Sequence, residues 1–364
     1  MLAVEHTDGL EPAISASQFQ LYAQSIRGWR LPMGRTDALP SGASGLPLRY
    51  FTPDPITEIV ARCSVAPFQR QHQGNDPAIA LLFCRAASRN AAGEVDLLQS
   101  NRLCREVLAT SQLPMDVPAL ISLAREIWPA TTGLRREISF AGGSTASTAT
   151  KIYAPHPELP QLMASLAELS HELPAIDPLV LSSLIGYFCA NAHPFSDGNG
   201  RWSRLVALRI SKSKGLVATS INITFQNLLK LGLATKVWPM THHEGPEKYL
   251  RHAVTFEQLI SKELSASGLS TISKSITKVI SERCNNGKAR RDVLLDIYGT
   301  GRLSKDRLRS LMPLSERSAA NLLLQIEESG NGLLTSSDEI LSASLLHRRT
   351  DEILRVAAIQ TIEQ

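Results

Sequence analysis

The feature that most constrains the fold is an apolar segment, DPLVLSSLIGYFCAN, which occupies residues 177–191. Apolar residues cover nearly every side of this segment, a pattern typical of a helix surrounded by other helices. Amphipathic segments with apolar residues every three or four positions lie on both sides of it, at residues 56–88, 95–110, 117–128, 158–171, 201–213 and 222–264. We therefore predict a mainly α chain whose helical bundle is built around residues 177–191.

Two parts of the chain depart from this helical pattern. In residues 134–160, short strand-forming segments at 137–140 and 151–153 flank a stretch rich in Gly, Ser and Thr. This arrangement favours a β-hairpin inserted among the helices over a low-complexity linker. In the first 50 residues, one amphipathic stretch near 17–29 is followed by clustered Pro, Gly and Ser, which indicates a loop or an extended covering segment.

The composition argues against several classes of protein. Hydrophobic residues make up 43% and charged residues 20%, which disfavours a disordered or fibrous chain. No apolar run approaches the roughly 18 residues of a transmembrane helix, and the N-terminal MLAVEHTDGLEP lacks the basic and apolar regions of a signal peptide. The five cysteines are scattered and form no CxxC pair. We therefore expect a cytoplasmic protein with reduced thiols and no membrane partner.

The C-terminal part is predicted to form a second domain. Residues 265–275 are rich in Ser and Thr with little apolar periodicity, and we interpret 265–284 as a linker. Beyond it lie three short amphipathic segments and a possible β-wing: ARRDVLLDIY, SKDRLRSLM, SERSAANLLLQIEES and GNGLLTSS. This order and spacing resemble a winged helix-turn-helix.

The positive charge of the chain is concentrated in this C-terminal part. Residues 270–320 contain 11 Lys or Arg and 5 Asp or Glu, whereas the whole chain has 38 against 34. Lys305, Arg307, Arg309 and the helix start at Ser315 are candidate DNA contacts. A DNA partner and a protein partner through residues 285–345 both remain open.

Three other groups of residues have simpler interpretations. Gly299-Thr300-Gly301-Arg302 is interpreted as a turn, because no phosphate-loop pattern follows it. The adjacent His242 and His243 would face different sides of a helix, so we interpret them as part of a surface loop and not as a zinc site. Cys189 has no evident activating neighbour and is expected to pack in the core.

The loop after the apolar segment combines groups suited to phosphate chemistry. It reads HPFSDGNGR, residues 193–201, and Arg204 follows. We expect the next helix to begin at Asn199 or Gly200, so that its free N–H groups form an anion site beside Arg201 and Arg204. Asp197 is a hard oxygen ligand suited to Mg²⁺, and His193 has an ordinary pKa near neutrality, which suits a general base.

This loop resembles the motif of the Fic (filamentation induced by cAMP) family, His-Pro-Phe-X-Asp/Glu-Gly-Asn-Gly/Lys-Arg, at every specified position. The hairpin resembles the flap of that family. The resemblance covers roughly residues 75–260 and implies a Fic domain at 75–264. Outside it we place an N-terminal extension at residues 1–74, the linker at 265–284 and the winged-helix-like domain with a C-terminal helix at 285–364.

The resemblance also implies an activity, a protein adenylyltransferase that transfers AMP from ATP to a Ser, Thr or Tyr hydroxyl of a target protein. His193 would be the catalytic base, and Asp197 would hold Mg²⁺. The groups implied to bind the nucleotide are Gly198, Asn199, Gly200, Arg201 and Arg204. The flap, with Gly142 and Gly143, would align the target segment by strand addition.

Regulation and alternative activities stay open. Many Fic proteins carry an inhibitory motif with Ser or Thr four residues before a Glu that is followed by Gly or Asn. Here Glu244 precedes Gly245, but Met240 stands four residues before it. A separate antitoxin-like inhibitor, a degenerate element and no inhibitor are all compatible with this sequence, as is a homodimer. The alternatives to AMP transfer are AMP removal or transfer of another phosphate-containing group by the same site, and a DNA-binding regulator whose Fic domain senses nucleotide.

Overall fold

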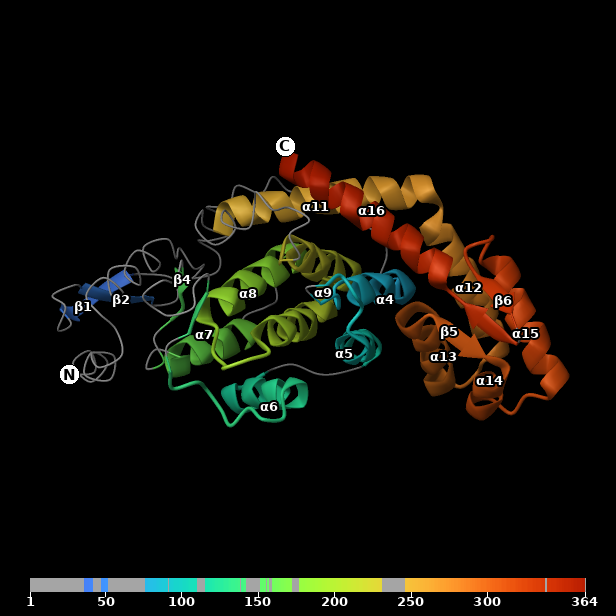
Figure 1. Ribbon diagram of the computed structural model, residues 1–364, viewed down its shortest axis with the longest axis horizontal. Coiled ribbons are helices and arrows are strands. Elements are labelled where there is room, and N and C mark those ends of the chain that lie inside the picture. Colours follow the sequence, from blue (N-terminus) through green and yellow to red (C-terminus); the bar gives the residue numbers. More distant parts are fainter. Residues whose placement is uncertain are drawn as a thin grey trace. The chain divides into compact units, whose positions relative to one another are not determined.

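The computed structural model describes residues 36–41, 47–51, 76–90, 92–109, 115–137, 139–141, 151–154, 156, 159–171, 177–230, 246–337 and 339–363 (Figure 1). Over these residues the chain is mainly helical, as predicted. The described residues form two compact units. The first unit takes those within Met1–Phe68, Gln112–Ile210 and Lys236–Arg251, and the second those within Gln69–Ser111, Ser211–Thr235 and His252–Gln364.

The first unit contains the apolar segment and the predicted hairpin. Its elements are β1 (Thr36–Ser41), β2 (Pro47–Phe51), α6 (Val117–Ile127), β3 (Phe140–Ala141), β4 (Lys151–Ile152), α7 (Leu159–His171), α8 (Pro178–Ala192) and the first part of α9 (Asn199–Lys230). β3 pairs with β4 in antiparallel register, Phe140 opposite Ile152, which confirms the hairpin. β1 and β2 form a second antiparallel pair in a region predicted as loop or extended chain.

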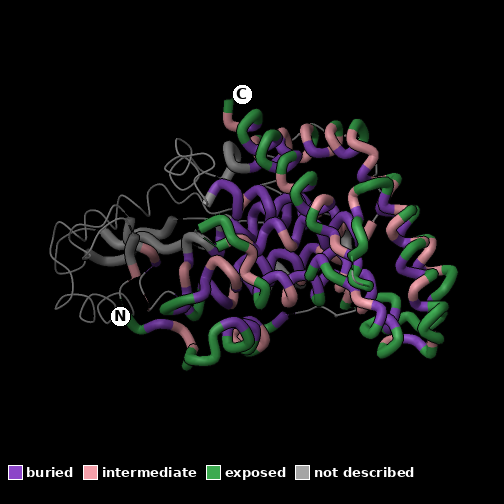
Figure 2. Tube along the Cα trace, turned by 45° about the vertical axis from the view of Figure 1, so that its right-hand side comes forward, coloured by how far each residue is buried: buried purple, intermediate pink, exposed green. Residues whose placement is uncertain are grey.

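Helix α8 is the buried helix that the sequence predicted. Pro178 occupies its first turn, and the carboxylate of Asp177 accepts hydrogen bonds from the N–H groups of Leu179 and Val180, so the helix has a well-satisfied start. The α8 side chains that are described are buried almost without exception, as Figure 2 shows for the centre of the chain. α8 packs against α7, and α7 against α6, so α8 provides a rigid base for the loop that follows it.

The second unit contains the remaining helices and a three-stranded sheet. Its helices are α4 (Pro77–Ala86), α5 (Leu97–Leu108), the second part of α9, most of α11 (Pro246–Ser267), α12 (Leu269–Arg283), α13 (Gly287–Leu294), the π-helical η3 (Leu295–Thr300), α14 (Lys305–Leu311), α15 (Glu316–Ser329) and α16 (Ser344–Glu363). The strands β5 (Arg302–Ser304), β6 (Thr335–Ser337) and β7 (Ile340–Ser342) form an antiparallel sheet in the order β5-β7-β6. The three predicted C-terminal helices and the strand after them are confirmed, whereas their assignment as a winged helix stays a prediction.

The segment interpreted as a linker, residues 265–284, is helical over most of its length. α11 continues to Ser267, and α12 occupies Leu269–Arg283. The many Ser and Thr residues lower intrinsic helix propensity, but a buried stripe of Leu269, Ser273, Ile276 and Ile280 provides tertiary packing that overrides it. The helix that begins at Asn199 was expected to end near Gly215, and the backbone is non-helical at that glycine, with φ −174° and ψ 82°, so α9 (Asn199–Lys230) consists of two helices that meet there.

The two units also differ from the predicted domain limits. Residues 76–109 were expected to share a domain with the loop at 193–201, but they group with the C-terminal helices. The physical basis is the packing of η3 against α4 and α5, together with the packing of α12 and α16 against α4. Among the described residues, no helix is both long and apolar enough to cross a membrane.

Candidate active site

His193 forms the C-cap of α8. Its backbone adopts the left-handed conformation, with φ 46° and ψ 56°, and its N–H donates to the carbonyl of Cys189 at 3.1 Å. Glycine is the usual residue for this conformation at a helix end, and a residue with a side chain costs about 1 kcal/mol there. Such a cost at a titratable residue is typical of a functional position.

The imidazole of His193 stacks on the ring of Tyr153. The ring centroids are 3.9 Å apart and the planes differ by 16°. Tyr153 follows β4, and its N–H donates to the carbonyl of Ser139 at 2.8 Å, which extends the hairpin by one bond. Tyr153 is partly buried, and burial raises the pKa of its phenol, with a smaller opposing effect from Arg135. The hairpin therefore supplies a neutral aromatic surface that fixes the plane of the imidazole.

Arg135 connects the end of α8 with both sides of the hairpin. The residue is 4% exposed, and its Nε donates to the carbonyl of His193 at 2.7 Å while Nη2 donates to that of Ala192 at 3.4 Å. The same guanidinium donates to the carbonyl of Glu137 at 2.7 Å and to the carbonyl of Ala154. A cation at a helix C-terminus satisfies carbonyls that have no partner in the helix and interacts favourably with its dipole.

No sequence pattern indicated a functional role for Arg135 or Tyr153. Arg135 belongs to an ordinary Arg-Arg pair before a short strand, and its role depends on carbonyls that lie 57 and 58 positions away in the sequence. The hairpin prediction placed Tyr153 at the end of a strand, but no local pattern indicated that its ring meets His193. Both roles follow from tertiary contacts alone.

Phe195 and Asn199 close the loop on itself. Phe195 is fully buried, and its ring lies 5.0 Å from that of Trp202 in an edge-to-face arrangement. The Phe195 N–H donates to Oδ1 of Asn199 at 3.0 Å, and Nδ2 of Asn199 donates to the Phe195 carbonyl at 2.7 Å. Trp202 Nε1 donates to the carbonyl of Leu120 on α6 at 3.0 Å. Because the Asn199 side chain is used within the loop, its backbone N–H is the group left for an anion.

The helix after the loop begins at Asn199, as predicted. Gly198 has a φ of +78°, which favours glycine, and its carbonyl accepts the first helical bond from Trp202 at 2.9 Å. The N–H of Gly198 donates to Oδ1 of Asp197 at 2.5 Å. The N–H groups of Asn199, Gly200 and Arg201 therefore belong to the first turn of α9, where a helix favours an anion.

The charged groups of the site lie at the start of α9. The Asp197 side chain is 58% exposed, and its Oδ2 lies 3.9 Å from Nη2 of Arg201. Arg204 is buried to 7% exposure one turn further along the same helix. On the other side of the loop, Ser196 Oγ donates to Oε1 of Glu137 at 2.9 Å. The loop thus joins a carboxylate, two guanidinium groups and a helix N-terminus within a few residues of His193.

The structure brings together the predicted site residues that it describes: His193, Asp197, Gly198, Asn199, Gly200, Arg201 and Arg204. Gly142, Gly143 and Glu244 lie outside the described residues. Cys189 is fully buried, and burial raises the pKa of its thiol well above the ordinary range, which agrees with a packing role.

A metal at this loop would depend on one carboxylate. The described part of the chain contains no group of three or more His, Cys, Asp or Glu that could hold a metal ion by itself. Mg²⁺, however, is commonly held by one or two carboxylates together with substrate phosphates and water. The exposed Asp197 beside the start of α9 fits that donor set.

Comparison with known proteins agrees with the motif. Residues 114–211 match the model of the Fic/DOC family, a range that contains the whole loop and is shorter than the predicted 75–264. The chain also resembles the structure of a Fic family protein from Desulfovibrio desulfuricans G20, with 17% sequence identity, 79% of this chain and 92% of that chain covered, and a TM-score of 0.36. No curated protein matches the chain. The match to the Fic/DOC family model is thus confined to residues 114–211, which include the whole loop.

Proposed function

We propose that the chain is a protein adenylyltransferase, which transfers AMP from ATP to a Ser, Thr or Tyr hydroxyl of a target protein. The observation that carries the proposal is the loop at residues 193–204. It places one imidazole, held by Arg135 and Tyr153, beside a helix N-terminus that bears Arg201 and Arg204. Members of the Fic family commonly transfer nucleotide or phosphate-containing groups to proteins, which supports the same chemistry.

His193 would act as the general base. The imidazole takes the proton of the target hydroxyl, and the hydroxyl oxygen attacks the α-phosphorus of ATP. The bond from that phosphorus to the bridging oxygen breaks, and pyrophosphate leaves. A positioned base contributes about 10²- to 10⁴-fold to such a step. Stacking on Tyr153 and the bond from Arg135 to the His193 carbonyl restrict the imidazole to one orientation before substrate binds.

The start of α9 would bind the phosphates. The backbone N–H groups of Asn199 and Gly200 face an anion along the helix axis, and Arg201 and Arg204 add two guanidinium groups. Asp197 would hold Mg²⁺, which supplies charge neutralisation of the phosphates when bound. Fixed donors and charges of this kind commonly contribute the largest share of catalysis.

The hairpin would receive the target segment. β3 and β4 are only two residues long each, so little of their backbone is used by the pairing between them. Strand addition uses main-chain hydrogen bonds and places few demands on the sequence of the target. The contribution of Gly142 and Gly143 to this contact remains a prediction.

Fewer basic side chains are available for DNA binding than the sequence indicated. Lys305 is buried, and its ammonium group forms ion pairs with Glu316 at 2.9 Å and with Glu339. Nε of Arg307 pairs with Asp296 at 2.9 Å. Both cations therefore stabilise the C-terminal helices. Arg317, exposed in the first turn of α15, is the side chain that best suits a DNA contact.

Mass spectrometry of cognate cell lysate tests the proposal. Lysate incubated with ATP and the native chain should contain proteins with AMP on a hydroxyl, and lysate incubated with the His193→Ala variant should not. Loss of AMP from proteins that carried it beforehand would favour the removal activity instead. Unchanged protein masses together with salt-dependent binding of duplex DNA by the full chain would favour the regulator.

A further inference from the structure

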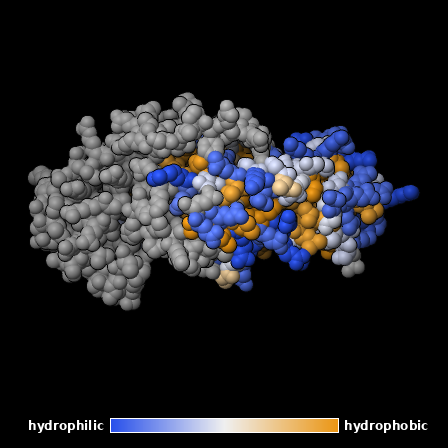
Figure 3. Space-filling view, turned by 90° about the horizontal axis from the view of Figure 1, so that it is seen from above, coloured by the Kyte–Doolittle hydropathy of each residue, from blue (hydrophilic) through white to orange (hydrophobic). Residues whose placement is uncertain are grey.

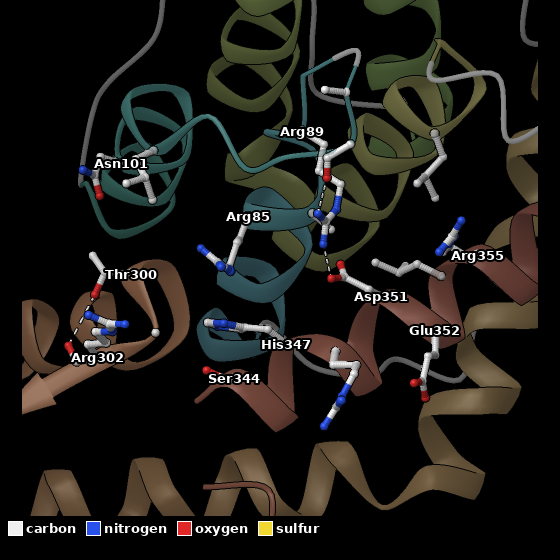
Figure 4. Close-up of a pocket in the computed structure, with 18 residues that line it drawn as sticks. Arg85, Arg89, Asn101, Thr300, Arg302, Ser344, His347, Asp351, Glu352 and Arg355 are labelled. Atoms are coloured by element: carbon white, nitrogen blue, oxygen red, sulfur yellow. Dashed lines mark hydrogen bonds and ion pairs between the residues drawn. The ribbon is translucent and has the colours of Figure 1, made fainter. Parts of the chain in front are cut away.

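The second unit contains a polar cavity whose lining comes entirely from its own residues (Figure 4). Its volume is about 1180 Å³, and its walls come from α4, the turn after it, α5, the turn between η3 and β5, and α16. Exposed large apolar side chains of this unit are spread over α5, α15, β7 and α16, among hydrophilic residues on the surface (Figure 3). The cavity, in contrast, gathers several charged side chains in its lining.

The cavity is strongly cationic. Its lining includes two carboxylates, Asp351 and Glu352, against five arginines: Arg85, Arg89, Arg302, Arg348 and Arg355. Both carboxylates are already engaged by cations. Asp351 forms an ion pair with Arg89, and Glu352 pairs at 3.6 Å with Arg349, which does not line the cavity.

The other four arginines of the lining have at most a distant carboxylate, since the charge of Asp351 also acts on Arg85 and Arg355. Within the part of the chain that the structure describes, none of them forms an ion pair: Arg85, Arg302, Arg348 and Arg355. They come from α4, β5 and α16, so three separate elements contribute positive charge to the lining. Figure 4 shows Arg85, Arg302 and Arg355 spread around the cavity. Several like charges along one lining raise the local positive potential.

Burial of part of the cavity lining makes this positive charge energetically more unfavourable. Arg85 is half-buried, with Nη1 donating to the carbonyl of Gly299 at 3.0 Å, and burial lowers the pKa of its guanidinium. His347 is 7% exposed, and burial followed by the charge of Arg85 lowers the pKa of its imidazole to about 3. His347 is therefore neutral near pH 7, and the arginines carry the positive charge alone. A desolvated cation without a counter-ion is unfavourable, and a bound anion removes that cost.

We propose that this cavity is a second anion site, which binds a small ligand with two or more phosphate groups, such as pyrophosphate or a nucleoside diphosphate. The planar guanidinium group bonds phosphate oxygens in pairs, and several guanidinium groups around one space suit more than one phosphate. Asn101, Thr300 and Ser344 also line the cavity and provide neutral hydrogen-bonding groups beside the arginines. The cavity volume of about 1180 Å³ exceeds the roughly 300–1,000 Å³ of usual small-molecule sites, so a nucleotide fits.

A small ligand suits the cavity better than duplex DNA. DNA is read by a protruding helix or strand that enters a groove, whereas these arginines surround a hollow. Arg85 and His347 lie on its inner wall, where the backbone of a duplex does not reach. His347 is committed to the fold, because its Nε2 donates to the carbonyl of Tyr298 at 3.0 Å, so the site binds and does not catalyse.

Two measurements on the full chain test the proposal. Equilibrium dialysis without divalent ions gives the affinity of the chain for radiolabelled pyrophosphate and, separately, for ADP. Comparison of the two affinities shows whether the nucleoside contributes to binding. Hydrogen–deuterium exchange locates the ligand. We expect slower exchange at residues 344–355 and 85–101. Arg348 and Arg355 are exposed, so the double variant Arg348→Glu, Arg355→Glu should fold normally and weaken binding at this site about tenfold or more.

Arg317→Glu is the matched control, because Arg317 is an exposed arginine of the same unit that does not line the cavity. This variant should leave both affinities unchanged. Slower exchange confined to residues 193–204 would mean that the ligand binds only at the Fic loop and would overturn the proposal. Equal losses in the control and the double variant, or binding of duplex DNA but of neither small anion, would overturn it as well.

Discussion

At the scale of single residues, the position of His193 depends on Arg135. Arg135 binds the carbonyls of Ala192 and His193 at the end of α8, and it also binds carbonyls on both sides of the hairpin. Tyr153, at the end of that hairpin, stacks on the imidazole. The imidazole that we propose as the base and the ring that stacks on it are thus both connected to one buried cation, whereas the start of α9, the proposed phosphate site, makes none of these contacts.

Replacing Arg135 should therefore separate catalysis from nucleotide binding. Arg135→Ala leaves several buried carbonyls without a donor and should lower the free energy of unfolding by at least about 2 kcal/mol. Transfer should slow about tenfold to a hundredfold through kcat, because the imidazole loses its orientation, while ATP affinity stays close to native. Urea unfolding and steady-state kinetics measure these effects. The neighbouring exposed Arg136→Ala is the control, and a loss carried by ATP affinity alone would contradict the positioning role.

His193 shows the conflict between function and stability at one position. Because its φ is +46°, His193→Gly should be more stable than His193→Ala by about 1 kcal/mol, although both lose the stacked ring. Both variants should bind ATP and transfer no AMP. Thermal unfolding compares their stabilities, and label incorporation compares their activities. Transfer by either variant would show that another group is the base.

Asp197 distinguishes a metal ligand from a residue that only stabilises its turn. Asp197→Asn keeps an oxygen that can accept the Gly198 N–H bond but removes the charge. We expect this variant to need at least about tenfold more Mg²⁺ for half-maximal transfer, because the single carboxylate of the loop is lost. Titration of activity with Mg²⁺ gives the value. An unchanged Mg²⁺ requirement together with a lower melting temperature in Asp197→Ala would assign the residue to the turn.

At the scale of elements, local pattern predicted α8, the start of α9 and the hairpin, because each has its own periodicity or turn residues. Local pattern did not indicate α12, because its many Ser and Thr residues mask a stripe of apolar residues. That stripe stabilises the helix only when it packs against other helices. Local pattern also indicated a surface cation at Lys305, because the two carboxylates that bind it, Glu316 and Glu339, lie 11 and 34 positions away. Such long-range pairs leave no local signal.

The docking of α16 onto the turn between η3 and β5 should depend on pH. Gly301, with φ +84°, lies so close to His347 that a Cβ there would be 2.7 Å from the imidazole, and Nε2 bonds the Tyr298 carbonyl. The pKa of His347 is about 3 in the fold and 6.5 ordinarily, so the unfolded chain binds the extra proton first. The stability that neutral His347 contributes is therefore complete above pH 6.5. It is lost as the pH falls toward 3, by at most about 1.4 kcal/mol of unfolding free energy per pH unit.

His347→Gln isolates this effect, because glutamine does not titrate and its amide can still donate to the Tyr298 carbonyl. The pKa values of the Asp76, Asp296 and Asp351 carboxyls are raised in the fold, so protonation of these groups stabilises the fold as the pH falls. This effect is the same in both proteins and cancels when they are compared. Urea unfolding from pH 7.5 to pH 4.5 should show a smaller loss of stability in the variant. Curves of unfolding free energy against pH that run parallel for the two proteins would contradict a neutral, buried His347.

At the scale of the whole molecule, the sequence indicated which residues share the loop at residues 193–204 but not how the helices group. The motif loop is continuous in sequence, so its residues meet wherever the chain folds around α8. The second unit joins residues 76–109 to helices that follow residue 252, through the packing of η3, α12 and α16 against α4. The arginine-lined cavity exists because of that grouping, and no local segment could have indicated it.

The central claim is AMP transfer by the loop at residues 193–204. The most direct test incubates the native chain and the His193→Ala variant with cognate lysate, Mg²⁺ and either α-³²P-ATP or γ-³²P-ATP, and measures label on protein. The account predicts label from the α-phosphate, none from the γ-phosphate, and none with the variant. Label from the γ-phosphate alone, or α-label that persists in His193→Ala, would contradict it.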